Sequence, residues 1–231
     1  MTTHPRPNHD DPRQPPRDLP RDHALRALHA AASALHRCGE LTWRRPFVLD
    51  PATACPVVSV EPRVFDAAGP DEREHLFFIP DEPALDAPRD APAPLQLLVT
   101  PEEIDARAHE AADRYAAYHG RARSPRMALL RIHTARLGAD VLDADELAFT
   151  NPLRATESSL LRLLNADRAL LAIACERAGA PRPHEPLAVG VDPWGLHVKG
   201  RVGVHRVEFP ARVDTPDAAR AAIESLLNAA R

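Results

Sequence analysis

Apolar residues that alternate with polar ones near the carboxyl end place the tightest constraint on the fold of this chain. Alternation with a period of two is typical of strands that bury one face, and it predicts a hairpin or meander. The residues that share it are Leu196, Val198, Val202, Val204, Val207 and Phe209. A further strand, residues 187–191, precedes them, and helical patterns over residues 156–177 and 215–230 flank the strands. Residues 151–231 are therefore predicted to form an α/β domain in the order helix, strands, helix.

Residues 23–150 are predicted to contain mainly β structure, because short runs rich in β-branched and aromatic residues lie between Gly and Pro signals. The predicted strands are residues 41–43, 56–65, 75–79, 95–99 and 127–137, the last turning at Gly138 into Val141 and Leu142. Turn signals at residues 69–70 and a proline-rich stretch over residues 81–94 predict loops between them.

Two helices are predicted in the same segment. Apolar residues at helical spacing from Leu25 to Leu35 predict a helix over residues 23–37. Pro101 suits a first helical position, and with the acidic residues that follow it predicts a helix over residues 101–119. We expect three histidines of the first helix to contact solvent: His23, His29 and His36.

Composition excludes several classes of protein. Residues 1–22 are polar and proline-rich, which predicts a disordered tail without the apolar core of a signal peptide. The net charge of -4 comes without a basic cluster, so we expect no nucleic-acid partner. No apolar stretch is long enough to span a membrane, and we expect a cytoplasmic protein. The 3 cysteines are widely spaced and form no Cys-x-x-Cys pair, which predicts neither a disulfide framework nor structural zinc.

The C-terminal segment carries three short sequences in a characteristic order. They are LLNADR at 163–168, VDPWGL at 191–196 and RVEFP at 206–210. In this order, and followed by a last helix, they resemble domain-of-unknown-function family 2470, the α/β domain found C-terminal to the split barrel of HugZ-type heme-utilisation proteins. Residues 56–60, 75–80 and 128–132 are similar to strands of that barrel. Within the family, the chain most resembles uncharacterised actinobacterial members.

This resemblance implies an α+β fold: a degenerate FMN-binding-type split β-barrel over residues 23–150, followed by a small α/β domain over residues 151–231. By analogy it also implies a homodimer. Two departures bear on function. Leu163 and Arg168 stand where the family usually has histidines, and the sequence ends at Arg231, without the tail histidine that ligates heme in HugZ-type enzymes.

These departures favour a non-catalytic binding or regulatory protein linked to heme or iron. One alternative is a flavin-dependent oxidoreductase or heme-degrading enzyme on the barrel, and another is a cofactor-free protein-interaction module with a protein partner. A heme cofactor and the absence of any cofactor are equally compatible with the sequence. FMN is less favoured, since no set of basic and hydroxyl residues suited to its phosphate is evident. No residue pattern identifies a nucleophile, a general base or a metal site.

Four residues are candidates for heme ligands. Histidine and cysteine thiolate are both known axial ligands of heme iron, and the candidates are His184, His197, His205 and Cys55. The alternative is that the histidines are solvated or hydrogen-bonded residues of strands and that Cys55 is a small buried group.

Three further residues are candidates for interface or structural roles. Asn165 and Asp167 are polar residues inside a predicted helix, where short polar side chains are disfavoured, so we expect them to bond a neighbouring segment. Trp194 lies in the turn after the strand at 187–191, where it either packs on the hairpin or anchors a partner.

Overall fold

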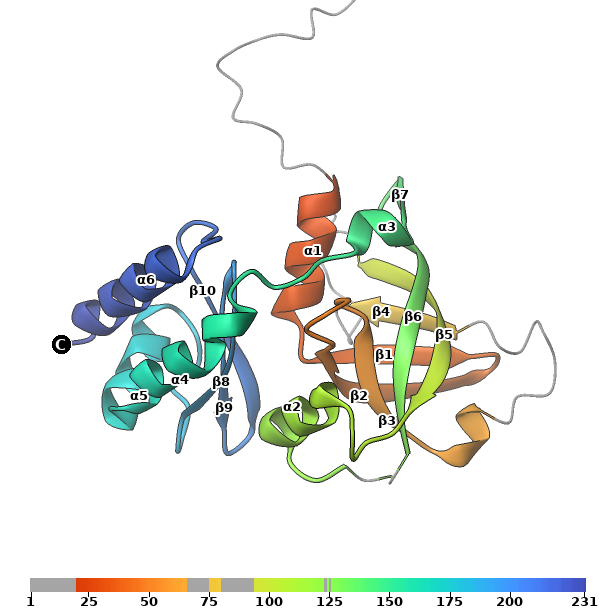
Figure 1. Cartoon of the computed structure of the whole chain (residues 1–231), viewed down its shortest axis with the longest axis horizontal. Coiled ribbons are helices and arrows are strands. Elements are labelled where there is room, and N and C mark those ends of the chain that lie inside the picture. The colour runs from red at the N-terminus through yellow and green to blue at the C-terminus, as the bar shows by residue number, and fades with distance from the viewer. Residues whose placement is uncertain (1–19, 66–74, 80–93, 123, 125) are drawn as a thin grey trace, which may run out of the picture.

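The computed structural model describes residues 20–65, 75–79, 94–122, 124 and 126–231. A β-barrel and a C-terminal unit lie side by side, joined by the segment between residues 147 and 157 (Figure 1). The predicted tail lies outside the described residues up to residue 19, and its last three residues already belong to a helix. The loops predicted at residues 69–70 and 81–94 lie outside the described residues except for Pro94.

Six antiparallel strands close the barrel. They follow the order β3-β2-β1-β4-β5-β6, and β6 pairs with β3 again. Their bounds are β1 (Ser33–Cys38), β2 (Leu41–Leu49), β3 (Pro56–Val60), β4 (His75–Ile79), β5 (Leu95–Ile104) and β6 (Arg126–Leu137). A short strand, β7 (Asp140–Asp143), extends the sheet beyond β6. The architecture is therefore mixed α+β around a closed barrel.

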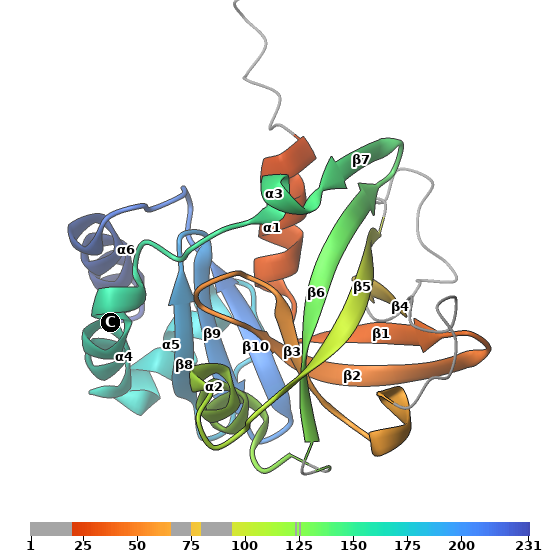
Figure 2. The same cartoon turned by 45° about the vertical axis from the view of Figure 1, so that its right-hand side comes forward.

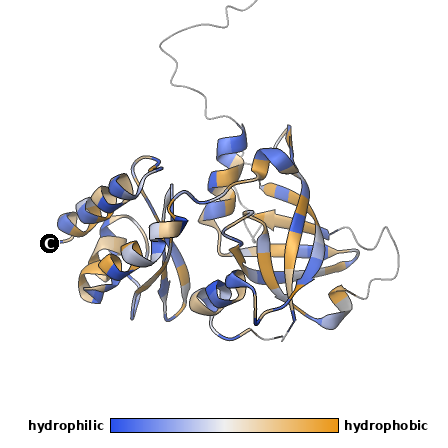
Figure 3. Ribbon diagram, viewed as in Figure 1, coloured by the Kyte–Doolittle hydropathy of each residue, from blue (hydrophilic) through white to orange (hydrophobic). Residues whose placement is uncertain are grey.

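Apolar side chains fill the interior of the barrel. Phe47, Phe77, Leu97 and Leu130 point inward from four strands and are at most 1% exposed. Figure 3 shows how apolar and polar residues alternate along the strands, as a one-sided core requires. Two helices, α1 (Pro20–Ala30) and α3 (Ala144–Leu147), lie together at one end of the barrel (Figure 2) and add apolar residues to the same core.

The barrel opens locally between β2 and β3. These strands form only three residue pairs, from Phe47 opposite Val58 to Leu49 opposite Pro56. The remainder of β3 pairs with β6 as far as Val60, and β2 continues away from it. A short 3-10 helix, η1 (Pro62–Val64), follows β3. This divergence leaves a gap in the wall of an otherwise closed barrel.

The C-terminal unit is a three-stranded sheet covered by helices. The sheet order is β10-β9-β8, formed by β8 (Leu187–Asp192), β9 (Gly195–Gly200) and β10 (Gly203–Glu208). Its helices are the short η3 (Arg154–Thr156), α4 (Glu157–Asn165), α5 (Arg168–Arg177) and α6 (Pro216–Ala229). Helices α4, α5 and α6 lie on the face away from the barrel, while the other face points toward α1 and toward α2 (Glu110–His119) (Figures 1 and 2).

Several sequence predictions are confirmed. The strands predicted at 75–79, 127–137 and 187–191 are present at those positions. The last helix is also confirmed, because the Thr215 side chain accepts from the Ala218 amide and Pro216 takes the first helical position. The strands predicted at 41–43 and 95–99 are longer than expected. In the part of the chain that the structure describes, no helix is both long and apolar enough to cross a membrane.

The helix predicted over residues 23–37 is wrong in its second half. Helix α1 ends at Ala30, and β1 follows it. Strand β1 pairs with β2 on one side and β4 on the other, and these hydrogen bonds to distant segments override the helical spacing. As a result His36 points into the barrel and is fully buried, and His29 is also buried, so the expectation that both contact solvent is wrong.

The helix predicted over residues 101–119 begins nine residues later than expected. Strand β5 continues through Ile104, and α2 starts at Glu110, where the His109 side chain accepts from the Ala111 amide. Backbone pairing explains the difference, because β5 stays paired with β6 as far as Ile104 opposite Met127. Cross-strand ion pairs add to it: Glu102 pairs with Arg131, and Glu103 pairs with Arg126. The predicted helix over residues 156–177 is also interrupted, since α4 and α5 are separate helices.

We expect Gly195→Ala to lower the free energy of unfolding by about 2–3 kcal/mol. A Cβ at Gly195 would lie 2.2 Å from the Val207 carbonyl oxygen, which is backbone and cannot rotate away. Urea denaturation followed by circular dichroism measures the change. Gly200→Ala is the matched control, because its Cβ would meet a side-chain carbon of Pro183 at 3.1 Å. Equal losses for the two variants would contradict the close-approach argument.

Candidate functional site

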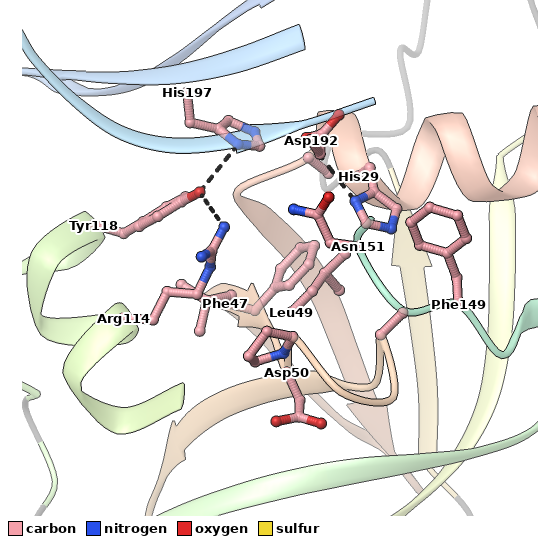
Figure 4. Close-up of a pocket in the computed structure, with 14 residues that line it drawn as sticks. His29, Phe47, Leu49, Asp50, Arg114, Tyr118, Phe149, Asn151, Asp192 and His197 are labelled. Atoms are coloured by element: carbon pink, nitrogen blue, oxygen red, sulfur yellow. Dashed lines mark hydrogen bonds and ion pairs between the residues drawn. The ribbon is translucent and has the colours of Figure 1, made fainter. Parts of the chain in front are cut away.

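A small cavity lined by both polar and apolar side chains lies where the C-terminal unit meets the barrel (Figure 4). Helices α1 and α2, strands β2, β8 and β9 and the connecting segment all contribute to its lining. The cavity has a volume of about 30 Å³, which is room for about one or two water molecules. Small-molecule pockets usually measure about 300–1,000 Å³. The cavity therefore excludes any ligand of cofactor size.

A buried ion pair stands beside this cavity. Arg206 of β10 donates from Nη1 and Nη2 to the two carboxylate oxygens of Asp192, at 2.5 and 2.7 Å. Burial opposes the ionisation of Asp192, but the charge and hydrogen bonds of Arg206 outweigh it and hold the pKa of that carboxyl below its usual value. Asp192 therefore carries a negative charge at the boundary between the two units.

His29 of α1 packs against this ion pair. Its Nδ1 lies 3.9 Å from Asp192, and its ring contacts Phe149 and Trp194 with centroid distances of 5.1 and 5.0 Å. Burial lowers the pKa of His29 to about 4, although Asp192 acts in the opposite direction. Its Nε2 is buried and has no hydrogen-bond partner among the described residues. His29 is therefore neutral at pH 7 and lines a cavity that admits only water.

A chain of hydrogen bonds crosses the same boundary. Arg114 of α2 binds Glu157 at 2.8 and 3.0 Å and donates to the Tyr118 hydroxyl at 3.1 Å. The Tyr118 oxygen lies 3.3 Å from Nδ1 of His197, and Nε2 of His197 lies 3.3 Å from the Ala30 carbonyl. Because a carbonyl only accepts, Nε2 carries the proton, and Nδ1 accepts from Tyr118.

Burial keeps His197 and Tyr118, two residues of this hydrogen-bond series, uncharged at pH 7. It lowers the pKa of His197 to about 3, with Arg206 adding to the effect, and it raises the pKa of Tyr118 to about 12. Figure 4 shows Tyr118 between Arg114 and His197. The Tyr118 hydroxyl and both ring nitrogens of His197 are thus bonded to protein partners. This series of hydrogen bonds holds α1, α2 and β9 together.

The four candidate heme ligands do not come together. His197 borders the small cavity, whereas the His184 side chain is 70% exposed and lies 4.0 Å from Glu185. His205 is half-buried on β10. Within the described ranges, no three His, Cys, Asp or Glu residues are placed to hold a metal ion.

Cys55 lines a second, larger cavity on the barrel. This Cys55 cavity measures about 480 Å³. Its lining residues are Asp50, Ala52, Thr53, Cys55, Glu102, Ile104, His109, Leu129, Arg131, Ile132, Ala144, Leu147 and Ala148. The large apolar side chains come from β5, β6 and α3, and the ion pair between Glu102 and Arg131 lies among the polar ones.

The three candidates for interface or structural roles all make contacts within the chain. Asn165 exchanges two hydrogen bonds with the backbone of Ala188, at 2.9 and 2.8 Å. Asp167 caps α5 by accepting from the Leu170 amide. Trp194 is 7% exposed and packs into the core of the barrel although it belongs to the C-terminal unit.

A third cavity follows the opening between β2 and β3. This β2–β3 groove measures about 750 Å³. Its lining residues are Ser33, Trp43, Arg44, Arg45, Pro46, Ser59, Glu61, Tyr115, His119, Arg121, Ser124 and Val202. Sequence reasoning did not identify it, because these residues come from five separate segments. The only local signal is the run Trp43-Arg44-Arg45, an aromatic residue followed by two cations.

Arg45 is held in place at the floor of the groove. Its Nη1 donates to the Ser59 carbonyl at 3.1 Å and its Nη2 to Glu61 at 2.7 Å, so the guanidinium bridges the gap between β2 and β3. Its centre lies 4.8 Å from the Trp43 ring centroid, within the range of a cation–π interaction. Arg45 thus presents a fixed, largely buried charge beside an aromatic ring.

Two buried histidines support Arg45 from inside the barrel. Nε of Arg45 donates to Nδ1 of His36 at 3.0 Å, so His36 carries its proton on Nε2, which lies 2.7 Å from Nδ1 of His75. Burial lowers the pKa of His36 to about 3, with His75 and Arg45 adding to the effect, and burial and Arg45 lower the pKa of His75. Arg45 therefore keeps the positive charge while both rings stay neutral.

Comparisons with known proteins support the fold and no more. No protein-family model and no curated protein matches this chain. The structure of Atu2129 from Agrobacterium tumefaciens str. C58, a protein of unknown function, matches with a TM-score of 0.65 and 21% identity over 93% of this chain and 99% of that one. A heme-binding protein from Mycobacterium smegmatis matches with a TM-score of 0.44 and 22% identity over 93% of this chain and 98% of that one.

We expect stability to fall as the pH is lowered from about 6.5 toward 4. The folded protein holds His29 with a pKa near 4, whereas in the unfolded chain it protonates near 6.5, so acid favours the unfolded state. His29→Gln should reduce the loss of unfolding free energy between pH 6.5 and 4 by up to about 3 kcal/mol. Thermal unfolding between pH 4 and 7.5 measures the slope, and His184→Gln is the exposed control. An unchanged slope in His29→Gln would refute the role of burial.

Proposed function

We propose that this chain is a non-catalytic binding protein for heme, built on a split barrel of the FMN-binding type, with the β2–β3 groove as its binding site. The observation that carries the proposal is the meeting of aromatic side chains and three arginines in one cavity of about 750 Å³. That volume lies within the usual range for small-molecule sites. The gap between β2 and β3 in the barrel wall is consistent with a split barrel.

The chemistry of the groove suits a flat, negatively charged ring. Trp43 and Tyr115 offer aromatic surface, and Arg44 and Arg121 offer positive charge. The charge of Arg45 is paired with Glu61, which lines the same groove. The arginines come from β2 and from the segment after α2, an arrangement that suits two separate carboxylates, such as the propionates of heme. Arginine binds carboxylates with a planar, forked geometry. The Cys55 cavity is smaller and has two acidic residues, Asp50 and Glu102, in its lining.

A binding role without turnover follows from where the titratable groups lie. His29, His197 and Tyr118 are the buried groups most suited to proton transfer, and they border a cavity with room only for water. The three arginines of the groove do not exchange protons. Its titratable residues are held by protein partners, His119 by the Phe47 carbonyl and Glu61 by Arg45. We further propose that the protein is a cytoplasmic homodimer. Size-exclusion chromatography with light scattering measures its oligomeric state directly.

FMN is the alternative ligand. It also joins an aromatic ring to an anion, and the groove brings together basic residues and the hydroxyls of Ser33, Ser59 and Ser124. Ser59 and Ser124 bond each other through the Ser59 hydroxyl, at 3.2 and 3.3 Å, which ties the segment after α2 to β3. Saturable binding of FMN in place of hemin would support the flavin alternative.

The expected result of a hemin titration is a saturable Soret band at one heme per chain. Arg121→Ala should weaken binding about tenfold, because it removes a charge-assisted contact. Arg136→Ala is the matched control, since Arg136 is an exposed arginine of β6 outside the groove. If hemin gives no saturable change, or if both variants bind equally well, the proposal is wrong.

The iron ligand is tested in the same titration. His119 is the proposed candidate inside the groove, because it lines the groove and its Nε2 is held at 2.8 Å from the Phe47 carbonyl. His184, His205 and Cys55 remain proposed candidates outside the groove lining, and His197 remains one only if its bonds to Tyr118 and Ala30 break. Each residue is replaced singly, histidines by Gln and Cys55 by Ser. Loss of the sharp Soret band in one variant identifies the ligand, and loss in Cys55→Ser alone moves the site to the Cys55 cavity.

A further inference from the structure

The C-terminal unit contributes one residue to the β2–β3 groove. The other lining residues come from β1, β2, β3 and α2 and from the segments that follow β3 and α2, whereas Val202 belongs to the turn between β9 and β10. Gly200 and Gly203 form the last pair of this hairpin, so Arg201 and Val202 make its two-residue tip. Val202 is 93% exposed, so nearly all of its side chain is open to contact with a ligand.

Neither the turn nor the core explains a valine at this position. Hairpin turns favour Gly, Asn and Asp, whose backbones adopt the required conformations, and a β-branched residue brings no such advantage. Val202 also lies outside the hydrophobic cores of both units. Its remaining surroundings are the groove and solvent.

Two hydrogen bonds hold the hairpin tip at the groove. Nζ of Lys199 donates to the Ala117 carbonyl at 2.9 Å, which ties β9 to the last turns of α2. The Arg201 amide donates to the His184 carbonyl at 3.0 Å, which anchors the tip from the other side. Tyr115 and His119 of α2 line the same groove. The backbone of the hairpin tip is therefore held beside α2, and the exposed Val202 side chain stands at the rim of the groove.

We infer that Val202 is a specificity-determining contact for the ligand of this groove, and that the groove selects a ligand with charge on one edge and apolar groups on another. The inference rests on the proposed function and extends it. Arg44 and Arg121 meet the charged edge. Val202 gains from burial against the apolar edge, as any exposed aliphatic side chain does when a ligand covers it. Heme, with carboxylates on one side and methyl and vinyl groups on the other, has this pattern.

The test compares Val202→Asn with Val141→Asn in the hemin titration. Val141 is the matched control because it is a 66% exposed valine on β7, outside the groove. Val202→Asn should weaken hemin binding about tenfold, the change that burial of one valine side chain supports. Val202→Ile should bind at least as tightly as the natural protein, and Val141→Asn should bind equally well. Val202→Asn should not lower the thermal unfolding midpoint, because the valine is exposed and hairpin turns favour Asn.

A second probe tests the selection of an apolar edge. An iron porphyrin with carboxylates on all four edges should bind the natural protein more weakly than hemin does. Val202→Asn should reduce the difference in affinity between the two porphyrins. If hemin binds, Arg121→Ala weakens it and Val202→Asn matches Val141→Asn, then this inference is overturned while the proposed function stands. If hemin does not bind the natural protein at all, the proposed function fails first, and the inference fails with it.

Discussion

The pairing of β3 with two neighbours is the constraint on which the rest of this structure depends. A barrel closes only if its last strand meets its first, and here a strand of five residues makes that closure by pairing with both β2 and β6. It stays with β2 for only three residue pairs. The wall therefore has a gap, and Arg45 fills it by donating to the Ser59 carbonyl and to Glu61. The closure of the barrel, the gap between β2 and β3 and the position of Arg45 all follow from the short length of β3.

The second constraint is the burial of charge between the barrel and the C-terminal unit. Asp192 and Arg206 are both removed from solvent, with side chains only 6% and 11% exposed, and such a pair is tolerated only with good geometry and further hydrogen bonds. Neutral histidines surround it, and Trp194 packs from the C-terminal unit into the core of the barrel. This interface fixes the position of the β9–β10 hairpin, and so places Val202 at the groove.

The groove is distinguished by the way its charged groups are held. The small cavity has room for water alone, whereas the β2–β3 groove has the volume of a ligand site and is lined by arginines, aromatic rings, serine hydroxyls, His119 and Glu61. Arg45 is paired with Glu61, and His36, itself bonded to His75, holds the Arg45 guanidinium in one orientation. The proposed binding of an anionic ring therefore relies on the charges of Arg44 and Arg121 and on the aromatic rings.

The sequence by itself determined the elements whose local pattern and environment agree, such as the strand at 187–191 and the helix that Thr215 caps. It misassigned residues 33–37 and 101–104, because strand pairing with distant segments outweighed helical spacing and a favourable first turn. Trp43 and Arg45 are visible in the sequence, but their partners His36, Ser59 and Glu61 are not, since only barrel closure brings these segments together. The tertiary structure alone decided the groove and the buried histidines, because hydrogen bonds between strands far apart in sequence leave no periodic signal.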